Sequence, residues 1–403
     1  MSASISRFFG ACFLVAGTTI GAGMLAMPTT NAFSGFFPIL FLLIFVWACM
    51  LSTAWIFLDV HLFAGVQTNL LTMSEKMLGK PAKILCWALY LLLLYSLTAA
   101  YIAGASSTLG FFLQSFLAIS VKKEMIASVL VGLFSFFLYF GTRSCDWINR
   151  VFMSALVLCY IALLMGIFPE MDLQLLQHED AQLMPIAIPV ILTSFGFHIV
   201  IPTLSTYLSG DKVQLRRVIF LGSFLALIVY ILWELVTLGS IPLQGKNSFQ
   251  TAWIHAESIT NIISSIIQSP WVKIAAFSFS FFAILTSFLG VSLSLSDFLS
   301  DGLSLKSATY RKICSLLLTF FPPLLFVLVY PKAFIAALEY AAIFVAILLG
   351  IYPTLMAFRL PSYQSLCKKA YLFVLLGVFS AIIVLAVLQE NGYFAAMLTR
   401  YMQ

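Results

Sequence analysis

Residues 17–28 read GTTIGAGMLAMP and place three glycines and a proline inside a long apolar run. Glycine and proline are poor helix formers, so this run predicts a helix that is interrupted in its middle. An interrupted helix has free N–H groups, which suit a carboxylate, and free carbonyls, which suit an ammonium group or a cation. Close helix packing through the GxxxG pattern of Gly17 and Gly21 is the alternative explanation. The candidate substrate-binding residues here are Thr18, Thr19, Ile20, Gly21, Ala22 and Gly23.

A second interruption is predicted at residues 193–198, which read TSFGFH and lie in an apolar run with Pro185, Pro189 and Pro202. Two interrupted helices in matching positions of two halves are a sequence sign of a transporter binding site. His198 has two interpretations, a neutral hydrogen-bonded side chain or a proton switch. The candidates that complete the pocket are Thr193, Ser194, Phe195, Gly196, Phe197 and His198.

Two further patterns suggest coupling to an ion. Small residues, several of which have hydroxyl side chains, recur at helical spacing over 280–294, with Thr286 beside Ser287. Their hydroxyl groups could bind a cation, or the residues could simply form a face for helix packing. Glu234 and Glu339 lie within apolar runs. A carboxyl group in hydrocarbon favours its neutral form and is therefore a candidate proton carrier. Glu339 lies near the end of its run and could instead face lipid headgroups.

The composition places these residues in an all-α polytopic membrane protein. Hydrophobic residues make up 62% of the 403-residue chain and charged residues only 9%, whereas soluble domains have roughly 25% charged residues. We predict eleven transmembrane helices, and residues 249–268 are expected to lie along the interface instead of crossing. The predicted spans are 8–28, 36–58, 84–109, 125–141, 148–168, 184–208, 218–241, 272–296, 313–330, 333–357 and 370–389.

The loop charges predict an orientation. Fifteen Lys and Arg residues fall on the side of the N-terminus and six on the other, so the N-terminus is expected in the cytoplasm and the C-terminus outside.

Several function classes find no support in the sequence. The seven cysteines form no CxxC pair, and no metal-ligand cluster or nucleotide-binding motif is present. The basic residues lie in loops and fit membrane orientation instead of nucleic-acid binding. We therefore expect neither an enzyme nor a metal or other cofactor.

The chain is expected to form one membrane domain over residues 1–403, because no linker divides it. The two interruptions lie five spans apart, and an odd repeat enters the membrane from the opposite side the second time. This predicts a first repeat at about 8–168, a second at about 184–357 and an extra helix at 370–389.

The sequence resembles the hydroxy- and aromatic-amino-acid permease family, and its tyrosine- and tryptophan-specific branch in particular. The resemblance rests on GTTIGAGMLAMP, on TSFGFH and on LTSFLGVSLSLSDFLSDGL at 285–303, and extends through nearly all of the chain.

That resemblance implies the fold of the amino acid–polyamine–organocation superfamily, a LeuT-like pair of inverted five-helix repeats with helices 1 and 6 broken around the substrate. It also implies import of tyrosine or tryptophan by proton symport and alternating access across the bacterial inner membrane. Thr18–Gly23 would bind the carboxylate and amine, and Thr286 and Ser287 would lie where sodium-coupled relatives hold a cation. Some proton-driven superfamily members have a lysine in helix 5, but residues 148–168 contain none. A serine- or threonine-type carrier and an uncoupled facilitator or exchanger remain alternatives.

Overall fold

A computed structural model describes residues 2–66, 68–139, 142–255, 258–267, 269–302, 308–330, 333–394 and 397–398. Every regular element in these ranges is a helix. The long helices are α3 (Phe36–Ala64), α5 (Lys80–Leu117), α6 (Lys123–Tyr139), α7 (Thr142–Ile167), α10 (Lys212–Leu238), α13 (Pro270–Gly302), α14 (Ala308–Val329) and α17 (Leu366–Glu390). α15 (Ala333–Val345) continues through a π-helical stretch, Ala346–Ile351, into α16 (Tyr352–Ala357).

Two of the apolar runs form helices that are interrupted. The first consists of α1 (Ser2–Thr19) and α2 (Gly23–Asn31), whose axes differ in direction by 52°. The second consists of α8 (Met184–Ser194), a 3-10 turn at Phe197–Val200 and α9 (Ile201–Tyr207). Both interruptions lie where glycine-containing segments were expected to prevent a continuous helix.

Nine helices in the described residues are long and apolar enough to cross a membrane, and the bent α1–α2 pair makes ten. The chain is therefore a multi-pass membrane protein. The further span predicted at 125–141 corresponds to α6, which has 17 described residues, or about 25 Å of helix, against a hydrocarbon core of about 30 Å. Residues 140–141 lie outside the described residues, so eleven spans remain a prediction. The 249–268 segment forms α11 (Phe249–His255) and α12 (Ile259–Ile266), which are too short to cross.

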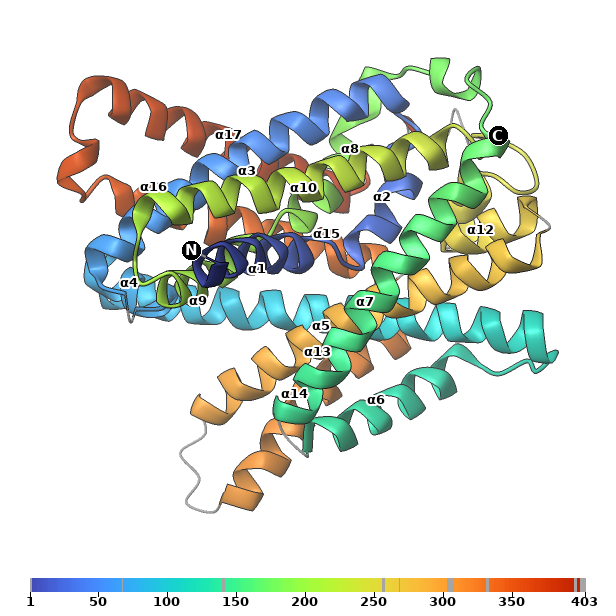
Figure 1. Ribbon diagram of the computed structural model, residues 1–403, viewed down its shortest axis with the longest axis horizontal. Coiled ribbons are helices and arrows are strands. Elements are labelled where there is room, and N and C mark those ends of the chain that lie inside the picture. The colour runs from blue at the N-terminus through green and yellow to red at the C-terminus, as the bar shows by residue number, and fades with distance from the viewer. Residues whose placement is uncertain are drawn as a thin grey trace.

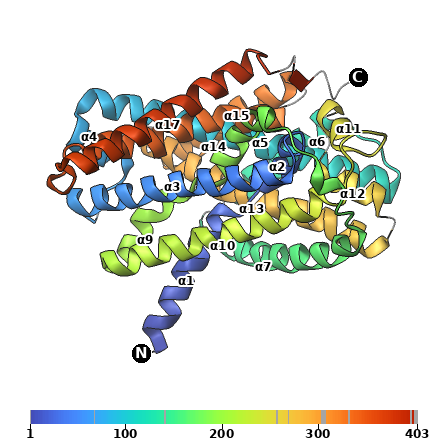
Figure 2. The same cartoon turned by 90° about the horizontal axis from the view of Figure 1, so that it is seen from above.

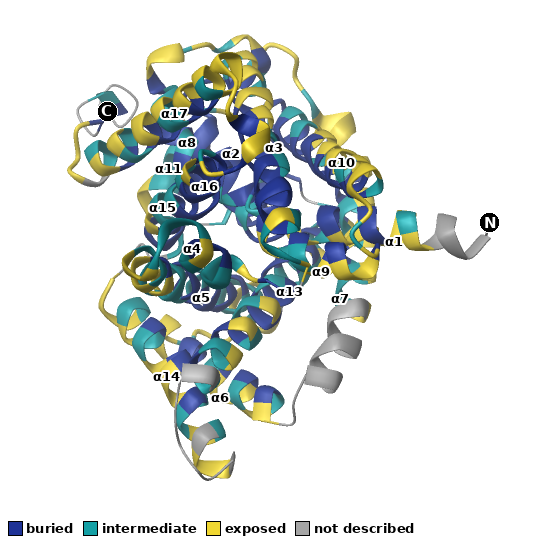
Figure 3. Cartoon of the chain, turned by 90° about the vertical axis from the view of Figure 1, so that its left-hand side faces the viewer, coloured by how far each residue is buried: buried dark blue, intermediate teal, exposed yellow. Residues whose placement is uncertain are grey.

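The interrupted helices lie in the middle of the bundle. α10 packs on both α1 and α3, α8 packs on α2 and α15, and α13 packs on α5 and α7 in the neighbouring layer (Figure 1). Every residue of α2 from Met24 to Asn31 is buried, and buried residues gather around α2, α3 and α8 (Figure 3). The N-terminal part of α1, in contrast, extends away from the body of the bundle (Figure 2), and Phe9 on it is exposed, whereas Val15, Ala16 and Thr19 in its second half are buried.

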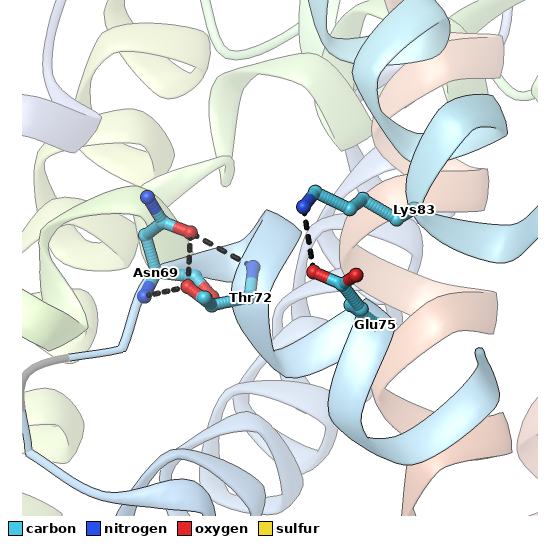
Figure 4. A network of polar contacts seen from close by, with 4 residues as sticks. All are labelled: Asn69, Thr72, Glu75 and Lys83. Atoms are coloured by element: carbon cyan, nitrogen blue, oxygen red, sulfur yellow. Dashed lines mark hydrogen bonds and ion pairs between the residues drawn. The ribbon is translucent and has the colours of Figure 1, made fainter. Parts of the chain in front are cut away.

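The two ends of the bundle are distinguished by their short elements. The α4 end has α4 (Leu70–Leu78), α9 and the start of α1, whereas the α12 end has α11, α12 and three 3-10 turns between residues 168 and 183 (Figure 1). α4 begins with a reciprocal cap between Asn69 and Thr72, and Lys83 forms a 2.6 Å ion pair with Glu75 (Figure 4). That hydrogen bond lowers the pKa of Glu75.

Candidate functional site

The first interruption is a short gap in the backbone ladder between α1 and α2. The last bond of α1 joins the Ile20 N–H to the Ala16 carbonyl at 2.8 Å, and the ladder resumes with the Met24 N–H and the Gly21 carbonyl at 3.2 Å. Within the gap, the Ala22 N–H donates to Ser287 Oγ of α13 at 3.3 Å. In the part of the chain that the structure describes, the N–H groups of Gly21 and Gly23 have no hydrogen-bond acceptor.

The glycines of this segment allow three other helices to approach. A Cβ on Gly21 would overlap Ser287 Oγ, one on Gly23 would overlap Ser194 Oγ of α8, and one on Gly17 would lie 2.8 Å from the end of the Met153 side chain. Each of the three glycines therefore permits a close contact with another helix. Since each glycine faces a different helix, the packing brings several elements to one interruption and does not form a single dimer-type face.

The second interruption lies directly against the first. α8 ends at Ser194, whose hydroxyl bonds to the Val190 carbonyl at 2.8 Å and whose side chain faces Gly23. The Thr193 hydroxyl bonds to the carbonyls of Pro189 at 2.9 Å and of Leu338 in α15 at 3.2 Å. Of the expected pocket residues, Phe195, Phe197 and His198 are fully buried, whereas Thr193 and Gly196 retain partial exposure.

Tyr230 of α10 joins the two interruptions. Its hydroxyl is 2.5 Å from the Thr19 carbonyl at the end of α1 and 3.1 Å from the Ser194 carbonyl at the end of α8. One turn further along α10, Trp233 Nε1 donates to the Met24 carbonyl at 2.8 Å. The Thr19 and Ser194 carbonyls lie at helix C-termini, and the Met24 carbonyl has Pro28, which lacks an N–H, four residues on, so none of the three has its ordinary intrahelical partner. No sequence pattern singled out Tyr230, although its spacing from Glu234 places both on one helix face.

Glu234 lies on that same face of α10 and is fully buried. Asn31 at the end of α2 donates from Nδ2 to Glu234 Oε1 at 2.9 Å, and Thr30 donates to Asn31 Oδ1 at 3.2 Å. Glu234 Oε2 has no hydrogen-bond partner in the described residues. The carboxyl group therefore faces a neutral amide, and no ion pair is found for it in that part of the chain.

The hydroxyls expected on α13 have different surroundings. Ser287 reaches the first interruption, where it accepts the Ala22 N–H and donates to the Ala283 carbonyl at 3.1 Å. The Thr286 hydroxyl bonds to its own helix at Phe282 and Ala283. Elsewhere on the small-residue pattern, Ser280 bonds to Thr260 of α12 at 2.6 Å, which is a packing contact.

His198 is enclosed beside α3. Its Nε2 is 3.0 Å from Thr53 Oγ1, and the Thr53 hydroxyl proton is directed at the carbonyls of Cys49 and Met50. Either atom of this pair can be the donor, depending on the tautomer of the ring, and His198 Nδ1 has no hydrogen-bond partner in the described residues. The ring also packs edge-on against Phe57 with centroids 6.1 Å apart.

Two of the candidates lie away from the interruptions. The Thr18 side chain is exposed and bonds to the Leu14 carbonyl of its own helix at 2.9 Å. Glu339 lies near the α12 end, where Gln389 of α17 donates to its Oε1 at 2.6 Å. The structure therefore does not bring Glu339 together with Glu234 or with the helix interruptions.

An ionic cluster at the α4 end was not expected from the sequence. Asp59 of α3, with its side chain 7% exposed, forms ion pairs with Lys212 and Arg216 of α10, both at 2.8 Å. Tyr363, between α16 and α17, donates to the same carboxylate at 3.0 Å. Burial and the nearby Asp59 carboxylate raise the pKa of Tyr363. The cluster connects three segments that are distant in the sequence.

A small cavity borders α2 on the side of the α12 end. It has a volume of about 30 Å³ and is lined by Thr29 of α2 and by Ser107 and Thr108 of α5. Phe334 of α15 closes over Gly104, where a Cβ would meet its ring at 3.1 Å. A cavity of this size has room for about one water molecule.

Comparison with known proteins finds relatives over most of the chain. The profile of the tryptophan/tyrosine permease family matches residues 4–392. The chain is 36% identical to the "Tyrosine-specific transport system 1" of Haemophilus influenzae, with 84% of each chain covered. It is 28% identical to the "Tryptophan-specific transport protein" of Pseudomonas aeruginosa (86% of this chain and 85% of the relative covered) and 29% identical to the "Glutamine transporter 2" of Aliivibrio fischeri (89% and 90% covered). These relatives are transport proteins and not enzymes, and the chain belongs to the tryptophan/tyrosine permease family.

Proposed function

We propose that this protein is a secondary active transporter that imports tyrosine, tryptophan or both by proton symport. The observation that carries the proposal is the contact between two interrupted helices, with Gly23 against Ser194 and Tyr230 joining their ends. Broken helices in a membrane survive where protein encloses them, and their ends recognise charged groups of a substrate.

The interruptions offer a receptor for a zwitterion. The free N–H groups of Gly21 and Gly23 suit the substrate carboxylate, and the carbonyls at the end of α1 suit its ammonium group. Ile20, Thr193 and Gly196 retain partial exposure at the two breaks and can contact the rest of the substrate. Since every amino acid has the same charged groups, the choice of side chain depends on other residues that line the pocket.

Glu234 is proposed to carry the coupled proton. An ionised group at mid-membrane costs about 2.5–3.5 kcal/mol on insertion scales, and the described partner of Glu234 is a neutral amide. Ser287, at the position where a sodium ion would be expected, already accepts the Ala22 N–H and donates to Ala283. This arrangement favours protons over sodium as the coupling ion.

Alternating access is supported by the unequal packing of the first interrupted helix. α2 is buried along its length and Phe334 closes the cavity beside it, whereas the N-terminal part of α1 extends from the bundle. With the N-terminus in the cytoplasm and the C-terminus in the periplasm of a bacterial inner membrane, this arrangement is closed to the outside. The proposed repeats, residues 8–168 and 184–357, would move around the site.

A different amino acid is the main alternative substrate. The relative named "Glutamine transporter 2" is 29% identical to this chain over 366 residues, so similarity at this level includes a transporter with a non-aromatic substrate in its name. A serine- or threonine-type carrier and an uncoupled facilitator or exchanger belong to the same set of alternatives.

The decisive test is uptake of labelled tyrosine and tryptophan by cells that lack their own aromatic carriers. We expect accumulation above the external concentration, collapse of that accumulation with a protonophore, and no change in sodium-free buffer. Competition with unlabelled amino acids would identify the preferred ring. Uptake of glutamine, serine or threonine with neither ring would overturn the substrate assignment. Uptake that only equilibrates would overturn proton coupling.

A further inference from the structure

An apolar groove runs along the outside of the bundle between α6 and α14, which pack side by side at its edge (Figures 1 and 3). It has a volume of about 240 Å³, and its described lining is apolar except for Ser135. The lining comprises Val131 and Ser135 of α6 and a row on α14 from Ile313 to Leu324. In that row Leu317 and Phe321 are exposed, so the groove faces the surroundings of the bundle.

A lysine lies at one end of this groove. Lys312 Nζ is positioned over the ring of Tyr139, 4.9 Å from its centroid. Tyr139 is one helical turn beyond Ser135, and Lys312 is one turn before Leu316, so both continue the faces that form the groove. In the part of the chain that the structure describes, no carboxylate or other acceptor contacts the three N–H donors of Lys312. The groove therefore combines an apolar channel with a cation at its end.

The length of the groove corresponds to one leaflet of a bilayer. Between Lys312 and Leu324, α14 advances by twelve residues, or about 18 Å. The hydrocarbon core of a bilayer is about 30 Å thick, so one leaflet contributes about 15 Å. Lys312 also lies on the side that the loop charges assign to the cytoplasm, where anionic lipids attract lysine and arginine.

We propose that the groove between α6 and α14 binds an anionic phospholipid, with an acyl chain along the groove and the phosphate paired with Lys312. A second copy of this chain fits the groove less well. A two-fold axis along the membrane normal would place both Lys312 side chains at the same depth of the contact, where like charges repel. A zwitterionic lipid gains less from the lysine, because its headgroup has a cation of its own. The inference does not depend on which substrate is transported.

The floor of the groove is connected to the first interruption. Phe320 is 2% exposed and packs edge-on against Phe288 of α13, with centroids 5.8 Å apart. Phe134 of α6 packs on the same ring at 4.4 Å. Phe288 follows Ser287, whose hydroxyl accepts the Ala22 N–H in the gap between α1 and α2. An acyl chain against Phe320 therefore supports the helix that contacts the interruption, and we expect it to speed the proposed transport.

Binding is tested by native mass spectrometry of the full-length protein in detergent, with dioleoyl phosphatidylglycerol or dioleoyl phosphatidylcholine added at equal concentration. We expect one phosphatidylglycerol molecule to bind about fivefold more tightly than phosphatidylcholine, because one lysine acts on the anionic headgroup. Lys312→Gln should remove this preference. Lys273→Gln is the matched control, since Lys273 is also a partly exposed lysine near the start of a long helix, α13, and lies outside this groove. Equal binding of both lipids to the unaltered protein, or an unchanged preference in Lys312→Gln, would overturn the assignment.

Three further results separate the acyl chain from the charge and from a second copy. Ser135→Phe fills the groove and leaves Lys312 in place, so it should lower the binding of both lipids; undiminished binding would place the lipid elsewhere. Glycerol phosphate has the charge without the chains and should not displace phosphatidylglycerol; displacement would assign Lys312 to a free anion and overturn the proposal. A dimer that dissociates in Ser135→Phe would assign the groove to a second copy and would also overturn it.

Transport in proteoliposomes provides a readout that rests on the proposed function. The initial rate of amino acid uptake should rise with the phosphatidylglycerol fraction in the unaltered protein and in Lys273→Gln, but not in Lys312→Gln. A rise that persists in Lys312→Gln would overturn the link between this groove and the first interruption. If no amino acid is taken up in any lipid mixture, the proposed function fails, and mass spectrometry still decides the lipid site.

Discussion

Replacing Tyr230 with phenylalanine should disconnect the two interrupted helices without changing the shape of the core. The ring is fully buried and packs edge-on against Phe195 with centroids 5.2 Å apart, so the phenylalanine ring can keep that contact. What is lost is the single hydroxyl proton that serves the carbonyls of Thr19 and Ser194. Leaving a buried carbonyl without a donor costs about 1–3 kcal/mol. The transport cycle must form and break the arrangement that contains this contact. A cost of that size therefore corresponds to a fall of roughly 5–150-fold in the uptake rate at low substrate concentration.

The control for this variant is Tyr160→Phe. Like the Tyr230 hydroxyl, the Tyr160 hydroxyl of α7 donates to a backbone carbonyl, that of Val229 in α10 at 2.8 Å. Its ring likewise packs against an aromatic residue, Phe279. It contacts neither interruption, so we expect a loss of about 0.5–1.5 kcal/mol in thermal stability and near-normal uptake. Uptake should be measured at equal amounts of inserted protein. If Tyr230→Phe transports like the unaltered protein, or if both variants lose uptake equally, Tyr230 does not link the two helices.

Four other changes test separate contacts. Glu234→Gln keeps an acceptor for the amide at the end of α2 and should abolish accumulation while leaving exchange of labelled for unlabelled substrate; retained accumulation would exclude Glu234 as the proton carrier. Gly23→Ala should lower uptake through overlap costing about 1–3 kcal/mol, and adding Ser194→Gly should restore part of it; no rescue would mean that the residues do not touch. Asp59→Asn should lower stability by about 1–2 kcal/mol, because two ion pairs to half-exposed partners are lost, as checked by the melting temperature of the purified protein. The pKa of Glu75 is lowered in the folded state, so its ion pair with Lys83 stabilises α4 at pH values above the ordinary pKa of 4.5, and this stabilisation is lost as pH falls through the folded-state pKa. Protection of the α4 amides from hydrogen exchange, corrected for the intrinsic exchange rate, should then fall in the unaltered protein but not in Glu75→Gln.

The interruptions could be predicted from the sequence because they are local. Glycine and proline density between residues 17 and 28 disfavours helix irrespective of the surroundings, and the structure has its break at Ile20–Ala22. The break at Phe195–Gly196 follows from the same reasoning. The number of membrane spans is harder to predict from the sequence, because α6 has 17 described residues and the position of its end depends on what surrounds it.

The contacts that hold the interruptions in place could not be predicted in this way. Tyr230 and Thr19 are 211 residues apart, and Asp59 and Tyr363 are 304 residues apart. A single tyrosine in an apolar helix resembles any other aromatic core residue until the fold brings an unpaired carbonyl to it. For Glu339, whose position in an apolar run made it a coupling candidate, the fold adds a contact with Gln389 that no local pattern indicated.

The face of α10 suggests how a proton and a substrate could be coupled without touching. Tyr230 contacts the end of α1, Trp233 contacts the start of α2, and Glu234 contacts Asn31 at the end of α2. α2 has nine residues and is therefore about 13 Å long, with the proposed substrate groups at one end and the proposed proton carrier at the other. A short buried helix such as α2 moves as a rigid body, so a displacement of one end also displaces the other. Because an ionised carboxylate accepts the Asn31 Nδ2–H bond more strongly than a neutral acid does, gain or loss of the Glu234 proton changes how firmly the far end of α2 is held, and we expect the substrate contacts at Gly21 and Gly23 to change with it.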